Sequence, residues 1–453
     1  MAQSLTQPPT EVAIIGGGLA GLTLAIALHR LKIPSTVYEA RPEDYNLGGG
    51  LILSPNALGA LDKIGLYERV RSKALEFDKL FFKDDQDETT DIYYFGSKAV
   101  YGYQALRIMR KDLLNELVAT VRECGIPVHF NSALATITNT DPNPADVTQD
   151  PNHNHNVEFT LTNGRTVSAS LLVGADGIHS TVRSIFLPEA KSKYAGILGI
   201  NCVVQRSQLR IPDDYGLPAI AMGKPGGFLL VPQKPDGSEL YVGAQRLFPE
   251  LDPAGWNALR QDKQRLYSMI HENKAEWPDI VQSALEAMPV DSMGFWAFHS
   301  LQPLPSWLLS EARNVILVGD AAHAIPPTVG QGANQAVEDV YTLALLLSKL
   351  SPDTPLDKIA VLWQSYRQER VQRILDLTQQ MNAKRLPTAE KANLPAGAIW
   401  TESSFLSPDG DRDELGWLYK CDLSNEVESW VQELRLSAGS PLQHAGQDGH
   451  QAE

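Results

Sequence analysis

Cysteine is scarce in this sequence, with only three residues among 453, Cys124, Cys202 and Cys421. Their spacing fits no disulfide framework, zinc site or redox motif, which indicates a reducing compartment. Apolar runs of about 18 residues, the length that spans a membrane, are also absent. The first ten residues, MAQSLTQPPT, lack the basic and apolar regions of a secretory signal. We therefore expect a cytoplasmic protein without a membrane span.

Positive charge is in short supply as well. The 39 Lys and Arg residues are outnumbered by 54 Asp and Glu, and the formal net charge is −15. This acidic balance argues against nucleic acid or an anionic membrane surface as a partner. The length exceeds that of one ordinary domain and allows a large core.

Residues 11–40 contain the motif around which the chain is organised. The apolar run Val12 to Ile15 predicts a buried strand. It ends in Gly16-Gly17-Gly18-Leu19-Ala20-Gly21, a G-x-G-x-x-G turn, which a helical pattern follows. A second apolar run then ends at Glu39. The order is strand, glycine turn, helix, strand and terminal acid.

Each residue of this motif suits the binding of a dinucleotide. Gly16 permits the tight turn, Gly18 lets a pyrophosphate approach the backbone, and Gly21 lets helix and strand pack closely. The helix N-terminus offers free N–H groups to the phosphates. Glu39 falls where a carboxylate accepts the ribose hydroxyls, which suits FAD or NAD rather than NADP. The alternative is an ordinary glycine-rich turn, but the flanking strands and Glu39 favour dinucleotide binding.

Two later apolar runs, Leu171 to Gly174 and Val315 to Val318, predict strands of the same sheet. A strand-rich segment separates them, and long helical patterns follow from about Gln331 and from about Asp357. The segment 139–156 has no apolar period, so we expect a disordered surface insertion there. It contains His153 and His155, for which a metal role is disfavoured because no other ligands cluster nearby.

Two longer motifs stand at the ends of these strands. They are LLVGADGIHSTVR at 171–183 and VILVGDAAHAIPPTVGQGANQAVEDV at 315–340. Together with the glycine turn, their order and spacing resemble the group A flavin monooxygenases, the family of para-hydroxybenzoate hydroxylase, over residues 11–350. Many fungal secondary-metabolism hydroxylases belong to it.

The resemblance implies an enzyme that binds FAD and consumes NADPH or NADH and O2. Its substrate would be a small aromatic molecule, such as a phenol, an indole or a polyketide-like compound. This substrate is hydroxylated or epoxidised by a flavin C4a-hydroperoxide, from which water must be excluded. Secondary metabolism is the setting that the fungal members suggest.

The resemblance also implies roles for individual residues. Asp320 holds the ribitol and pyrophosphate region of FAD. Gly330 and Ala333 begin a helix whose N-terminus faces the pyrimidine edge of the flavin, where the reduced ring carries negative charge. Asp176 lies in the region that family members use for flavin and nicotinamide contacts.

Two further segments match cofactor positions of the family. Arg110 matches the arginine that pairs with an FAD phosphate or ribose, and Arg107 is the nearby competitor. Gly50 belongs to the Gly48–Leu51 segment, whose backbone approaches the flavin. For His323, a hydrogen-bonded structural role is favoured over a catalytic one.

The group that activates the substrate should lie on the inserted sheet, where the family varies most. Arg206 and Tyr241 are the polar groups suited to hold a phenolate, and they are our catalytic candidates. Asn201, Met222 and Gln245 are candidates to line the pocket. For each of these residues the alternative of an ordinary sheet position stays open.

We therefore expect an α/β fold: a Rossmann-like (GR2-type) FAD-binding domain with an inserted antiparallel β-sheet substrate domain and C-terminal helices. The FAD-binding domain is expected at 11–75, 100–185 and 300–350. The substrate domain is expected at 76–99 and 186–299, and a helix with a polar tail at 351–453.

Two other functions use related scaffolds. One is an FAD-dependent reductase or dehydrogenase, as in the geranylgeranyl reductases. The other is a non-enzymatic binder like the GDP-dissociation inhibitors, against which the complete set of Glu39, Arg110 and Asp320 argues. A flavin-dependent halogenase is disfavoured because the sequence lacks W-x-W-x-I-P.

Overall fold

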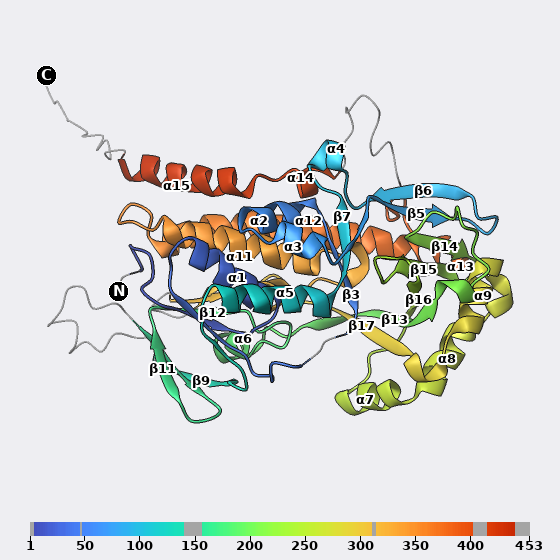
Figure 1. Cartoon of the computed structure of the whole chain (residues 1–453), viewed down its shortest axis with the longest axis horizontal. Helices are drawn as coiled ribbons and strands as arrows, with labels where there is room; N and C mark the ends of the chain where they lie inside the picture. The colour runs from blue at the N-terminus through green and yellow to red at the C-terminus, as the bar shows by residue number, and fades with distance from the viewer. Residues whose placement is uncertain (1–3, 46–47, 140–155, 310–313, 402–414, 440–453) are drawn as a thin grey trace, which may run out of the picture.

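The computed structural model describes residues 4–45, 48–139, 156–309, 314–401 and 415–439. The segment predicted to be disordered, with His153 and His155, lies outside these ranges except for its two end residues. Figure 1 shows an elongated molecule. Long helices and the N-terminal sheet form one half, and a second sheet with α7, α8 and α9 forms the other.

The first sheet has six strands in the order β18-β19-β12-β1-β2-β8. Neighbouring strands are parallel, except that β18 is antiparallel to β19. Val12 of the central β1 pairs with Leu171 on one side and Ser35 on the other. The strands are β1 (Val12–Ile15), β2 (Ser35–Tyr38), β8 (Val128–His129), β12 (Leu171–Gly174), β18 (Leu308–Leu309) and β19 (Val315–Leu317).

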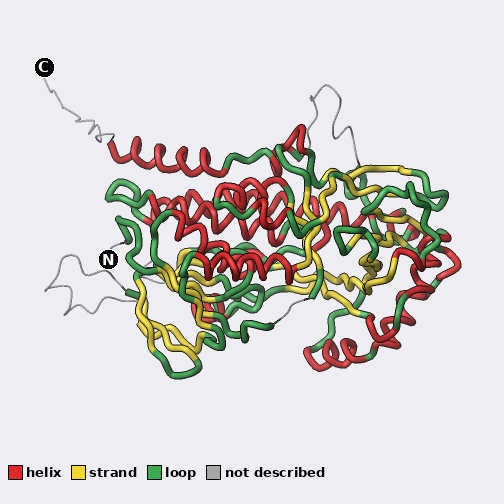
Figure 2. Tube along the Cα trace, in the orientation of Figure 1, coloured by secondary structure: helices red, strands yellow, loops and turns green. Residues whose placement is uncertain are grey.

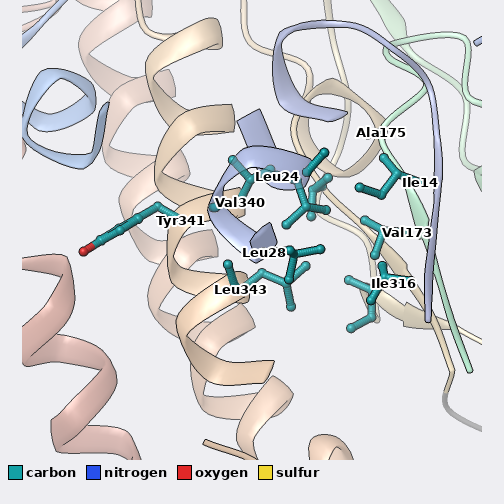
Figure 3. Packing of buried hydrophobic residues seen from close by; sticks show 14 of the residues in the cluster. Ile14, Leu24, Leu28, Val173, Ala175, Ile316, Val340, Tyr341 and Leu343 are labelled. Carbon is teal, nitrogen blue, oxygen red and sulfur yellow. The ribbon is translucent and has the colours of Figure 1, made fainter. Parts of the chain in front are cut away.

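Helix α1 lies between this sheet and a further helix. Figure 3 shows Leu24 and Leu28 of α1 pointing between Ile14 of the sheet and Val340 and Leu343 of α11. All of these side chains are buried, and a helix that is apolar all round needs such a buried position. The helices of this unit are α1 (Leu19–Arg30), α2 (Pro55–Lys63), α3 (Tyr67–Arg71), α5 (Arg110–Glu123), α6 (Thr181–Phe186), α10 (Asp320–His323) and α11 (Gly332–Ser348).

Two small sheets accompany the first. β9 (Leu134–Asn139), β10 (Val157–Leu161) and β11 (Thr166–Ala169) form one, in which β10 and β11 make a hairpin around Asn163-Gly164. β3 (Gly50–Leu53), β7 (Ala105–Met109) and β4 (Leu75–Phe77) form the other. In it Gly50 pairs with Met109.

The large sheet has seven strands in the order β17-β13-β16-β15-β14-β5-β6. Only the β14–β5 pair is parallel, and it joins two separate parts of the chain. The strands are β5 (Lys79–Lys83), β6 (Thr89–Tyr94), β13 (Lys193–Gln205), β14 (Ala219–Gly223), β15 (Gly226–Pro232), β16 (Glu239–Leu247) and β17 (Gly294–Ser300).

The two faces of the large sheet differ. Leu198, Ile200 and Val242 point to one face and form a core with helices α7 (Pro253–Gln261), α8 (Lys263–His271) and α9 (Asp279–Ala287). Because side chains alternate along a strand, their neighbours point to the opposite face. We call this the open face, since the members used below are only partly buried: Asn201, Met222, Leu229, Tyr241 and Gln245.

The C-terminal helices join the two halves. The 29-residue helix α12 (Leu356–Lys384) runs beside α11, and its second half packs near β14 through Ile374, Leu377 and Met381. Figure 2 shows how this long helix extends toward the strand-rich half. The remaining helices are α4 (Lys98–Tyr101), α13 (Thr388–Lys391), α14 (Gly416–Tyr419) and α15 (Leu423–Gly439).

The predicted fold class is confirmed: an α/β cofactor unit, an inserted sheet and C-terminal helices. The domain boundaries themselves stay predictions. Within the described ranges, none of the helices has the length and apolar character needed to cross a bilayer.

Candidate cofactor and substrate site

The glycine turn leaves space where a phosphate is expected. A Cβ on Gly21 would lie 1.9 Å from the carbonyl oxygen of Gly16, so this position must be glycine. A Cβ on Gly18, in contrast, would have no atom within 4 Å. Gly18 caps α1 without a side-chain hydrogen bond, and the first turn holds no acid. The free N–H groups of this turn therefore face open space, as an anion site requires.

Glu39 is held beside this turn at the end of β2. Its Oε2 accepts a hydrogen bond from the Gly17 N–H at 2.6 Å, and its Oε1 accepts one from the Arg41 N–H at 2.8 Å. The side chain is only partly buried. The carboxylate thus sits next to the helix N-terminus with one side accessible, which is the arrangement that a ribose contact needs.

Arg110 and Asp320 come from distant parts of the chain and lie close enough to interact. Burial lowers the pKa of Arg110, and the charge of Asp320 opposes this effect. Burial likewise raises the pKa of Asp320, while His323, Arg110 and Arg183 lower it. Asp320 nevertheless has solvent access. Asp320 is thus a solvent-accessible carboxylate within reach of two cationic side chains, and we call Asp320, Arg110 and Arg183 the Asp320 cluster.

The position of Asp320 distinguishes Arg110 from Arg107, the two candidates for the arginine that contacts FAD. The backbone N–H of Arg110 donates to the Gly49 carbonyl at 2.9 Å, so Arg110 also adjoins the Gly48–Gly50 segment. Arg107 points elsewhere: its guanidinium contacts the Gln233 side chain. Of the two, Arg110 is the one beside Asp320.

Asp176 braces the turn that leads from β12 into α6. Its Oδ2 accepts hydrogen bonds from the N–H groups of Thr181 at 2.7 Å and Val182 at 3.1 Å, whereas its Oδ1 is buried without a partner. Arg183 donates to the carbonyls of Ile178 at 2.5 Å and Ala321 at 2.9 Å. This turn is therefore fixed against α10, near Asp320.

Helix α11 begins next to β3. Asn334 donates to the carbonyls of Ile52 at 2.9 Å and Gly330 at 2.7 Å, and it accepts from the Ser54 N–H at 2.9 Å. Gly330 adopts a left-handed backbone with φ +66°, and no side chain caps the helix start at which Ala333 lies. A second uncapped helix N-terminus thus faces the Gly50 strand. The sequence analysis gave Asn334 no role.

A buried ion network sets the position of α11. Burial alone would raise the pKa of Glu338, but Arg367 and Arg370 lower it to about 2. Asp339 accepts from Arg367 Nε at 2.8 Å and from the Gly319 N–H at 2.8 Å. His323 Nε2 lies 2.5 Å from the same carboxylate, which supports the structural role expected for this histidine.

The two catalytic candidates are not brought together. Tyr241 lies on the open face, and burial raises its pKa to about 12, an effect that nearby Arg107 opposes. Arg206 comes directly after the last residue of β13, so the alternation of side chains along that strand does not place it on the open face. Its guanidinium is partly exposed and donates to the Asp213 carbonyl at 3.4 Å. The three pocket-lining candidates, in contrast, share the open face with Tyr241: Asn201, Met222 and Gln245.

The sequence analysis assigned no substrate role to either of two buried arginines near the open face. Arg107 is 8% exposed, with its Cζ 5.9 Å from the Tyr241 ring centre, and Arg385 is 9% exposed. Neither forms an ion pair with a carboxylate among the described residues. Buried cations without an acidic partner are costly, and the Nε atoms of both arginines are buried without a hydrogen-bond partner within the described ranges.

These segments define a dinucleotide-binding protein of the α/β class, with a helix N-terminus, an acid at a strand end and the Asp320 cluster. The chain belongs to the FAD binding domain family, whose family model matches residues 9–380. This family membership confirms the resemblance to the group A flavin-dependent aromatic monooxygenases. The fungal secondary-metabolism type stays a prediction.

Individual relatives agree with this assignment. A salicylate hydroxylase of Pseudomonas putida is 29% identical, over 76% of this chain and 78% of the relative. A 3-amino-4-hydroxybenzoate 2-monooxygenase of Streptomyces platensis is 27% identical, over 90% of this chain and 95% of the relative. The solved structure of CtdE with FAD and a substrate is 20% identical and covers 95% of this chain and all of that one, with a TM-score of 0.72. That last likeness concerns the fold alone.

Proposed function

We propose that this protein is an FAD-dependent monooxygenase that uses NADPH or NADH and O2 to hydroxylate a small aromatic molecule. The observation that carries the proposal is the combination of two uncapped helix N-termini, Glu39 at the first of them, and the Asp320 cluster. The relatives named above hydroxylate aromatic acids, as their names state.

The residues present fit FAD. The N–H groups at Gly18 and the Glu39 carboxylate would hold the pyrophosphate and the adenosine ribose. Arg110 and Asp320 would hold the phosphate and ribitol region, and the start of α11 would face the pyrimidine edge of the flavin. When bound, FAD supplies the redox chemistry: it accepts the hydride and activates O2. We assign these tasks to 11–75, 100–185 and 300–350.

The chain's own residues then position the substrate and exclude water. We assign this task to 76–99 and 186–299, which contain the open face. Met222 and Leu229 offer apolar cover there. Tyr241, whose pKa burial raises to about 12, keeps its proton at neutral pH and can donate a hydrogen bond to a substrate oxygen. Arg206 receives no role in this proposal because it lies outside the open face.

The test is direct. Purified protein reconstituted with FAD is supplied with NADPH or NADH and a panel of phenols and hydroxybenzoates. We expect stimulated NAD(P)H oxidation, matching O2 uptake, and a product heavier by one oxygen atom. Protein that binds no FAD would refute the proposal. Substrate turnover without O2 would identify the alternative reductase or dehydrogenase.

A further inference from the structure

The chain returns from the large sheet to the first sheet through residues 301–307, which we call the return segment. Helix α12 holds this segment, because the Trp307 N–H donates to the side-chain oxygen of Gln364 at 2.8 Å. At its other end, the Leu301 N–H donates to the carbonyl of Ala324, directly after α10, at 3.1 Å. The return segment is therefore fixed between α12 and α10.

A small hollow lies beneath the return segment. Its walls come from the segment itself, from Ala322 and His323 of α10, and from Val371 and Gln372 of α12. The hollow has a volume of about 20 Å³, and one water molecule needs roughly 10–15 Å³. Gln372 is exposed, so one wall of the hollow lies at the surface. The hollow therefore accommodates a single water molecule that comes from solvent.

Two nitrogen atoms of side chains that line the hollow are buried without a partner in the described part of the chain, Trp307 Nε1 and His323 Nδ1. Trp307 is 1% exposed and His323 is 4% exposed, and their ring centres lie 5.1 Å apart. The neighbouring Trp363 shows the usual situation, since its Nε1 donates to Thr342 Oγ1 at 2.9 Å. Buried polar groups need a hydrogen-bond partner, and a bound water that bridges two of them supplies it.

His323 connects this hollow to the cofactor segment. Its Nε2 lies 2.5 Å from Asp339 Oδ2, and the same oxygen accepts a hydrogen bond from the Gly319 N–H at 2.8 Å. Gly319 has a backbone φ of +59° and directly precedes Asp320. A rotation of the imidazole ring would take Nε2 away from Asp339. A partner that holds Nδ1 in place therefore also holds the carboxylate that positions the Gly319 backbone.

We propose that one water molecule is bound between Trp307 Nε1 and His323 Nδ1, and that it fixes the imidazole in the orientation that supports Asp339. The indole N–H donates to this water. Because water both donates and accepts hydrogen bonds, it satisfies Nδ1 in either protonation state of the ring. Trp307 and His323 are thus positioning residues, which act on the cofactor segment through Asp339 and Gly319. The water site does not depend on the proposed function, whereas its effect on FAD binding rests on it.

A crystal structure of the FAD-loaded protein tests the site directly. We expect an ordered water at roughly 2.7–3.2 Å from both nitrogens. Trp307→Phe keeps an aromatic ring but lacks the N–H, and its crystal structure should lack this water. Trp363→Phe removes an indole N–H of equal burial and should leave the water in place. A wild-type hollow without ordered water, or a water that persists in Trp307→Phe, would overturn the inference.

The FAD affinity tests whether the water acts through His323. Trp307→Phe should weaken FAD binding roughly 3- to 10-fold, the effect of one neutral hydrogen bond. His323→Gln places an amide N–H near the position of Nε2 and has no ring that the water must hold. In the His323→Gln background, Trp307→Phe should therefore cause no further loss of FAD affinity, because the two changes interrupt the same chain of contacts.

The remaining outcomes assign other roles to Trp307. If its side chain only fills space, Trp307→Phe will weaken FAD binding equally in both backgrounds, and the inference fails. Unchanged FAD affinity in Trp307→Phe would refute the positioning role. Protein that binds no FAD would refute the proposed function, and crystals of the FAD-free protein would then still decide whether the water is bound and whether it is lost in Trp307→Phe.

Discussion

Arg367 donates a hydrogen bond from Nε to Asp339 Oδ1 at 2.8 Å, and neither side chain is exposed. The same carboxylate accepts from the Gly319 N–H and contacts His323. One buried ion pair therefore connects α12, α11 and the segment that begins with Asp320. The position of the Asp320 cluster therefore depends on an ion pair to which none of its three residues belongs.

Arg367→Met should destabilise the protein strongly. The substitution removes one of the positive charges that neutralise the buried carboxylates of Glu338 and Asp339. Breaking a buried ion pair typically costs about 3–5 kcal/mol of stability. Urea unfolding of the FAD-free protein measures this cost. Arg265→Met removes an exposed arginine of α8 and serves as the control. A loss no larger than that of the control would contradict the importance of the network.

The network also predicts an acid sensitivity. The folded-state pKa of Glu338 is about 2, below the ordinary value of 4.5. The folded protein therefore binds fewer protons than the unfolded chain between these values, and the contribution of Glu338 is lost as the pH falls from 4.5 toward 2. The difference in unfolding free energy between wild type and Glu338→Gln should shrink over this range. The exposed Glu369→Gln serves as the control variant.

Two glycines of the first turn should respond differently to alanine. Gly21→Ala places a methyl group 1.9 Å from the Gly16 carbonyl oxygen, so it should lower the free energy of unfolding by about 1–3 kcal/mol or more.

Gly18→Ala adds a methyl group that meets no atom, and it should leave the FAD-free protein as stable as wild type. It should weaken FAD binding roughly 10- to 100-fold by obstructing the phosphate. Full FAD affinity in Gly18→Ala would show that the open space is not the phosphate site.

Asp320→Asn should separate folding from cofactor binding. Burial raises the pKa of this carboxyl, so the neutral amide should be tolerated without loss of Tm in the FAD-free protein. The proposed contact of this side chain with the ribitol region should weaken, and FAD affinity should fall roughly tenfold or more. Fluorescence titration with FAD measures the affinity. Unchanged affinity would remove Asp320 from the site.

The sequence was informative where the chemistry is local. The turn from Gly16 to Gly21 and the acid at Glu39 are separated by one helix and one strand, so their relative position follows from the βαβ geometry. The strand that precedes Asp320 could likewise be recognised from its own residues. The fold class followed because each of these strands needs a partner in one parallel sheet.

The substrate side could not be predicted in this way. Arg385 ends a helix that was expected, but its contact with Gly227 joins residues far apart in the sequence, and an arginine is normally read as a solvated charge. Arg206 follows the strand that ends at Gln205, so strand alternation does not fix where its side chain points, and its substrate role stays a prediction. For the buried ion network, by contrast, the sequence does hold a signal. The adjacent acids Glu338 and Asp339 lie on an otherwise apolar helix, and buried acids of this kind require buried cations as partners.

The strand order has a consequence for how the protein is made. β1 is synthesised well before two of its sheet partners, because its neighbour β12 comes from 171–174 and the next strand, β19, comes from 315–317. Such distant pairing is slow, and an incomplete chain exposes unpaired edges. The parallel sheet that carries the cofactor-binding turn therefore cannot be completed until residues 315–317 have emerged from the ribosome. Flavin loading is consequently expected late in synthesis or after it.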